Sequence, residues 1–90
     1  MIRRHYVFTG DVQHVGFRWR ARKAADMFHC TGWCRNEPDE SVTMELQGSR
    51  IRICLVILAI RFSSRIRISH MEVTHIAPIR EELEFRSEYN

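Results

Sequence analysis

The chain has 90 residues and a mass of 10.8 kDa, a length at which we expect residues 1–90 to form a single domain. Its hydrophobic fraction of 44% and charged fraction of 28% are typical of folded proteins, which argues against a disordered or collagen-like chain. The formal net charge is only +3, but every basic residue except Lys23 is arginine, the side chain best shaped to bind phosphate and carboxylate groups.

The first third of the chain predicts a strand followed by a helix. Residues 3–9 are rich in β-formers and place Tyr6 and Phe8 on one side, so we expect a strand that ends at Gly10. From Phe17 the apolar period changes to that of an amphipathic helix of about three turns. The residues on its apolar face are Phe17, Ala21, Ala24, Ala25 and Phe28.

The middle of the chain predicts a β-hairpin. Residues 31–32, Thr-Gly, end the helix, and residues 33–36 and 41–47 have the pattern of two strands. The turn between them spans residues 37–40, where a proline and an aspartate favour a change of direction. We therefore expect the two strands to pair directly.

The segment 50–62 is ambiguous between helix and strand. It is long enough for a helix, and Ser49 is placed to cap one, but it is rich in β-branched isoleucine. Its length favours the helix. As a helix it would carry two apolar stripes on nearly opposite sides, one formed by Ile51, Leu55, Leu58 and Phe62 and the other by Ile53, Val56, Ile57 and Ile60.

Two short strands are expected to close the domain, at residues 67–76 and 82–85, separated at Pro78. The element order is then β-α-β-β-α-β with a short extra strand. This order predicts an α+β fold of the ferredoxin-like, split βαβ kind, in which two helices cover one face of an antiparallel sheet.

The cysteines and the apolar runs bear on the cellular setting. Cys30, Cys34 and Cys54 form an odd set in a chain with no recognisable secretory leader, which predicts reduced thiols in the cytoplasm. The longest apolar run, residues 53–60, is far below the roughly 20 residues that span a bilayer. We therefore expect a soluble cytoplasmic protein with no membrane partner.

The junction between the first strand and the first helix has the properties of an anion site. A helix N-terminus leaves several backbone N–H groups unpaired, with the positive end of the helix dipole behind them. Gly16 would let the backbone approach a ligand, and Arg18 could add a bidentate clamp. Local features alone leave open an ordinary turn followed by a solvated arginine.

Two segments in order carry a specific resemblance. Residues 12–18, Val-Gln-His-Val-Gly-Phe-Arg, followed by residues 32–36, Gly-Trp-Cys-Arg-Asn, closely resemble the two signature segments of the acylphosphatase family. The resemblance is clear from about residue 6 to residue 48. It implies a β-α-β-β-α-β domain of about this length, in agreement with the element order read from the pattern.

The resemblance also implies an activity. Acylphosphatases hydrolyse a small-molecule acyl phosphate to carboxylate and inorganic phosphate, with no metal, no cofactor and no covalent enzyme intermediate. By position, Arg18 matches the family's phosphate-binding arginine and Asn36 its water-positioning asparagine, so these two are the predicted catalytic residues. The predicted phosphate-binding residues are Gln13, His14, Val15, Gly16, Phe17 and Arg18.

The chain departs from the family pattern at two turns. The family usually has glycine at the position of His14, and histidine is among the few other residues that adopt a positive φ at modest cost. His14 would either add charge at the rim of the site below about pH 6.5 or point outward without a role. In the hairpin, Glu40 stands where the family commonly has glycine, which leaves the turn type open.

Three other interpretations concern a metal site, a non-enzymatic function and self-association. Cys30 and Cys34 lack partners at zinc-site spacing, so no metal site is expected. A non-enzymatic module that binds phosphate-bearing ligands or RNA is the alternative function, but nucleic acid is an unlikely partner because the basic residues are dispersed among acids. The second stripe of residues 50–62 predicts either a self-association surface or a buried strand, so we expect a monomer or a weak homodimer through residues 53–60.

Overall fold

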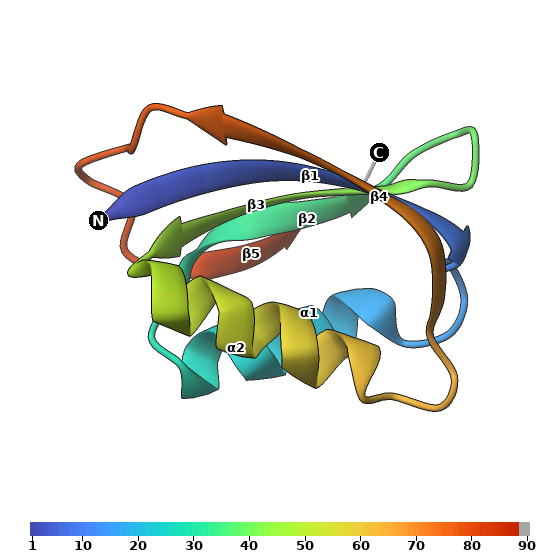
Figure 1. The fold of residues 1–90 in the computed structure, drawn as a ribbon. Helices are drawn as coiled ribbons and strands as arrows, with labels where there is room; N and C mark the ends of the chain where they lie inside the picture. The colour runs from blue at the N-terminus through green and yellow to red at the C-terminus, as the bar shows by residue number, and fades with distance from the viewer. Residues whose placement is uncertain (89–90) are drawn as a thin grey trace.

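Both helices cover one face of a single five-stranded sheet (Figure 1). The protein was analysed as a computed structural model that describes residues 1–88. The sheet order is β4-β1-β3-β2-β5, which confirms the predicted ferredoxin-like fold. The elements in chain order are β1 (Ile2–Asp11), α1 (Phe17–Met27), β2 (Thr31–Asn36), β3 (Val42–Gly48), α2 (Arg50–Arg61), β4 (Arg67–Ile76) and β5 (Phe85–Glu88).

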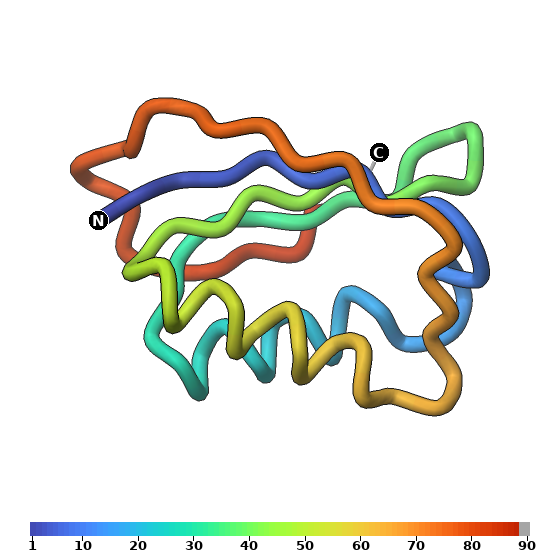
Figure 2. Tube along the Cα trace, viewed as in Figure 1, coloured from blue at the N-terminus to red at the C-terminus, as the bar shows by residue number. Residues whose placement is uncertain are grey.

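The fifth strand differs from its prediction in both place and direction. The first four strands pair antiparallel, as expected, but β5 runs parallel to β2, with Phe85 opposite Gly32. It forms at residues 85–88 rather than 82–85, because the buried Phe85 ring anchors it and Glu82 is held elsewhere. Figure 2 shows the chain after β4 passing the N-terminal end of β1 before it reaches the far edge of the sheet.

The core lies between the sheet and the two helices. Tyr6 and Phe8 of β1 stack with ring centroids 5.5 Å apart, and Phe17 of α1 packs against Phe8 at 5.1 Å. Ala21 and Ala25 are buried beneath them, so the helical period read from the sequence is confirmed. The first residue of α1 thus fixes the helix start against β1.

Residues 50–61 form a helix, and Ser49 caps it by accepting a hydrogen bond from the Arg52 amide at 3.2 Å. Ile53, Val56 and Ile60, all in the second stripe, lie in the core. Because the sheet and core cover these three side chains, they are not available for the predicted homodimer contact. Within residues 53–60, Leu55 and Leu58 are exposed, so the oligomeric state itself stays a prediction. The stripe left on the surface is formed by Ile51, Leu55, Leu58 and Phe62.

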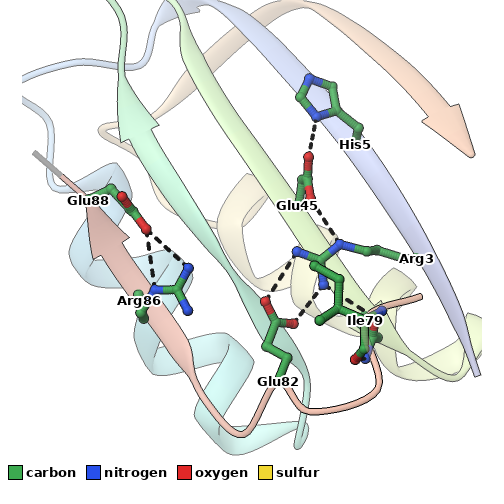
Figure 3. Close-up of polar contacts among 8 residues, drawn as sticks. Arg3, His5, Glu45, Ile79, Glu82, Arg86 and Glu88 are labelled. Atoms are coloured by element: carbon green, nitrogen blue, oxygen red, sulfur yellow. Dashed lines mark hydrogen bonds and ion pairs between the residues drawn. The ribbon is translucent and has the colours of Figure 1, made fainter. Parts of the chain in front are cut away.

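A buried arginine organises the face of the sheet opposite the helices (Figure 3). The Arg3 side chain is fully buried, and its guanidinium donates to Glu45 at 2.9 Å and to both carboxylate oxygens of Glu82 at 2.7 and 3.1 Å. The Gln47 amide exchanges two hydrogen bonds with the backbone of Ile79. These contacts hold the segment 77–84 against the sheet and so position the chain to enter β5.

The hairpin turn stores a small backbone strain at Glu40. Its φ is +71°, in the left-handed region that costs a residue with a side chain about 1 kcal/mol. We expect Glu40→Gly to raise the free energy of unfolding by about 0.5 to 1 kcal/mol, measured by urea denaturation. Glu81→Gly, in a loop position that does not adopt a positive φ, should give no gain. An equal effect of both changes on the free energy of unfolding would mean that the backbone at Glu40 is not strained.

Candidate active site

The loop between β1 and α1 is shaped by two residues with positive φ. His14 has φ +62° and Gly16 has φ +81°, so the expectation that His14 would adopt this region is confirmed. Apart from Gly16 and its chain neighbours, no atom lies within 4 Å of where a Cβ on Gly16 would stand, so the backbone angle and not a lack of space favours glycine. The Gly16 carbonyl accepts from the Arg20 amide at 3.0 Å and begins the helix.

A hollow of about 240 Å³ opens at this helix N-terminus, and it brings together the two residues predicted to be catalytic. Arg18 comes from the first turn of α1 and Asn36 from the last position of β2. Four of the predicted phosphate-binding residues are among those that line it, namely His14, Gly16, Phe17 and Arg18. The hollow therefore combines one guanidinium, one carboxamide and the backbone of a helix start with the side chains of Val12, His14, Phe17 and Trp19.

Gln13 and Val15 lie outside the lining of this hollow. The Gln13 side-chain amide donates to the carbonyls of Glu37 at 2.8 Å and Ser41 at 2.9 Å, at the turn that follows Asn36. Val15 lines a neighbouring hollow beside Phe62. The Gln13 side chain thus ties the loop to the hairpin, a positioning role that the sequence pattern did not indicate.

Arg18 lies half-buried against the far edge of the sheet. Its Nη1 donates to the Glu88 carbonyl at 3.1 Å, which links the first turn of α1 to β5. Beneath it, Cys34 is fully buried, and burial raises the pKa of its thiol to about 12, although the nearby Arg18 charge acts in the opposite direction. Cys34 is therefore a neutral packing residue at neutral pH and not a nucleophile.

The other candidate groups do not assemble into a second centre. All three cysteines are free thiols, and burial raises the pKa of Cys30 to about 11. Across residues 1–88, no three His, Cys, Asp or Glu side chains gather in a way that could hold a metal ion. The arrangement at the helix start can bind a small anion and hold a water beside it.

Comparison with known proteins decides the family. The Acylphosphatase family model matches residues 4–87, nearly the whole chain. The chain belongs to the acylphosphatase family. Family membership makes it a hydrolase of acyl phosphates. The first signature segment lines most of the hollow described above, and the second contributes Asn36.

Individual acylphosphatases agree with this assignment. The chain is 35% identical over 86 residues to the acylphosphatase of Koribacter versatilis, covering 94% of this chain and 78% of that protein. It is 37% identical over 83 residues to the acylphosphatase of Bifidobacterium longum, covering 91% of this chain and 84% of that protein. The crystal structure of acylphosphatase from Bacillus subtilis has the same fold, with a TM-score of 0.89, 24% identity and coverage of 99% of this chain and all of that one.

Proposed function

We propose that Arg18 and the backbone amides of residues 13–18 bind the phosphoryl group of a small acyl phosphate, and that Asn36 positions the attacking water. One observation carries the proposal: Arg18, Asn36 and Gly16 line the same hollow at the N-terminus of α1. We propose further that residues 1–90 act as one catalytic domain, because a single sheet and a single core run through residues 1–88.

The chemistry matches the groups present. The water oxygen attacks phosphorus, the bond from phosphorus to the acyl oxygen breaks, and its electron pair leaves with the carboxylate. A carboxylate is a good leaving group, so the step needs positioning and charge stabilisation more than a strong general acid. Arg18 and the helix N-terminus supply positive charge at the equatorial oxygens.

Proton transfer is assigned to the substrate. The Asn36 carboxamide accepts and donates hydrogen bonds but takes no proton at neutral pH. We therefore propose that a phosphate oxygen receives the proton of the water, without a metal, a cofactor or a covalent enzyme intermediate. Asn36 orients the water, and the two hydrogen bonds of Gln13 to the hairpin hold the loop at a fixed place beside it.

Asn36→Ala tests the water-positioning role. We expect kcat for benzoyl phosphate to fall by about 100-fold, because an attacking water held in line is lost. The inhibition constant of inorganic phosphate should change little, since Arg18 and the loop amides remain. Steady-state kinetics with phosphate as a competitive inhibitor measure both quantities.

Glu37→Ala is the matched control at the neighbouring position. Its carboxylate pairs with Arg35 at 3.0 Å, and the hydrogen bond from Gln13 uses its backbone carbonyl, which alanine keeps. This variant should keep kcat close to wild type. Full kcat in Asn36→Ala would exclude the proposed role of Asn36 while leaving the family's reaction intact.

A further inference from the structure

The outer surface of α2 carries an apolar stripe that the catalytic hollow does not use. Ile51, Leu58 and Phe62 are 73%, 60% and 85% exposed, and Leu55 lies between them. The stripe continues onto α1, because Trp19, which is 66% exposed and also stands at the catalytic hollow, lines a second hollow together with Phe62. A folded protein rarely exposes a continuous row of large apolar side chains without a partner for it.

The segment that contains α2, residues 46–71, has an unusual charge pattern. Residues 46–71 contain no aspartate and no glutamate but five arginines, so this stretch alone exceeds the net charge of +3 of the whole chain. All five are exposed. Arg50 and Arg52 stand at the start of α2, Arg61 stands at its end, and Arg65 and Arg67 follow.

The exposed side of α1 adds charge of the same sign. Arg22 and Lys23 are exposed, and the Lys23 ammonium lies 5.1 Å from the centre of the Trp19 ring. Asp26 is the sole acidic residue of α1. The two helices are joined at this surface by a hydrogen bond from Arg20 to the Ala59 carbonyl at 2.7 Å.

We propose that this helix face, formed by Trp19, Ile51, Leu55, Leu58 and Phe62 with the surrounding arginines, binds the surface of an anionic phospholipid bilayer. An apolar stripe edged by arginine is the pattern of a helix that lies in the plane of a membrane interface. The apolar side chains would enter the headgroup region while the arginines reach lipid phosphates and carboxylates. This inference does not depend on the proposed roles of Arg18 and Asn36.

The positive charge of this face favours an anionic bilayer over a second copy of the chain as its binding partner. Two copies meeting through α2 would bring five arginines against five arginines with no acidic residue in the segment to pair with them. An anionic bilayer supplies the missing negative charge together with an apolar layer. The proposal departs from the expectation of no membrane partner, which rested on the absence of a spanning segment. No helix of residues 1–88 is long and apolar enough to cross a bilayer, and binding at the surface does not need one.

Vesicle co-sedimentation of the intact protein tests the proposal. At about 0.1 M salt, binding should occur to phosphatidylcholine vesicles containing about one third phosphatidylserine and should be lost at about 1 M salt. Vesicles of phosphatidylcholine alone should bind much less. Leu58→Gln with Phe62→Gln should weaken binding about tenfold or more, and Arg61→Gln with Arg65→Gln about 30-fold.

Matched controls come from the opposite side of the sheet. Leu83 is 91% exposed in the segment 77–84, and Arg86 is exposed in β5 next to Phe85, whose ring faces the core, so Leu83→Gln and Arg86→Gln should bind vesicles like wild type. Hydrolysis of benzoyl phosphate without vesicles checks that each variant is folded. No binding to anionic vesicles, equal binding to neutral ones, or unchanged binding by the Leu58 and Phe62 double variant would overturn the proposal. Retention on polyglutamate or a dimeric mass, without vesicle binding, would assign the face to a protein instead.

Discussion

Arg18→Ala should lower kcat/KM for benzoyl phosphate by about 100-fold or more, the largest loss of activity expected from any single change in the chain. The Arg18 guanidinium is the charged side chain that lines the hollow, and it is half-buried at the helix start. A preorganised cation in this position stabilises the transferring phosphoryl group more than the ground state. Inorganic phosphate should also bind more weakly, because it carries the same oxygens.

Arg22→Ala is the matched control for this change. Arg22 lies one turn further along α1 and is exposed, so its removal changes the net charge equally without taking a group from the hollow. The expected result is near-normal kcat/KM and phosphate inhibition. Comparable losses in the two variants would mean that general positive charge, and not Arg18 itself, binds the phosphoryl group.

Arg3→Ala should give the largest loss of stability. Removing one partner of a buried ion pair leaves charges without compensation and typically costs about 3–5 kcal/mol. Here Glu82 would lose both of its hydrogen bonds from Arg3, and Glu45 would lose one. A loss of this size corresponds to a drop in Tm of roughly 12 °C or more for a domain of this length, measured by thermal denaturation.

The exposed pair Arg86–Glu88 provides the comparison. Its side chains are about half exposed, so Arg86→Ala should cost at most about 1 kcal/mol. Arg3→Lys, which keeps the charge but loses the planar fork, should lie between the two. Equal Tm values for Arg3→Ala and Arg86→Ala would show that the buried network does not hold the segment 77–84.

The Arg3 network also predicts the direction of a pH effect. Burial opposes ionisation of Glu45, but hydrogen bonds from His5 and Arg3 outweigh it and hold the pKa of the Glu45 carboxyl below its ordinary value. A carboxyl with a lowered folded-state pKa contributes stability above its unfolded pKa and loses it as the pH falls through the folded one. Stability should therefore decline below about pH 4.5, and less steeply in Arg3→Ala.

Much of the fold follows from local sequence pattern. The alternation of Tyr6 and Phe8 and the helical spacing from Phe17 to Ala25 predicted their elements, because each pattern has one apolar face. In α2 the pattern was not sufficient. Both stripes are apolar, so only the placement of the helix on the sheet determines that Ile53 is buried and Ile51 is exposed.

The contacts that sequence could not supply are long-range and polar. The strand after residue 82 was placed three residues too early because nothing local shows that Glu82 binds Arg3, 79 positions away. The sequence pattern placed Gln13 in the phosphate loop but gave no sign that its side chain also binds the hairpin carbonyls of Glu37 and Ser41. A charged residue at an inward or covered strand position, such as Arg3, is the signal that predicts a partner of opposite charge.

The most direct test of the proposed mechanism follows the oxygen atom of the attacking water into the products. Benzoyl phosphate would be hydrolysed by the enzyme in water labelled with heavy oxygen, with EDTA present, and both products examined by mass spectrometry. If Arg18 holds the phosphoryl group and Asn36 directs water at phosphorus, the rate is unaffected by EDTA and one labelled oxygen appears in the phosphate and none in the benzoate. Label in the benzoate would mean attack at the carbonyl carbon and would contradict the central claim.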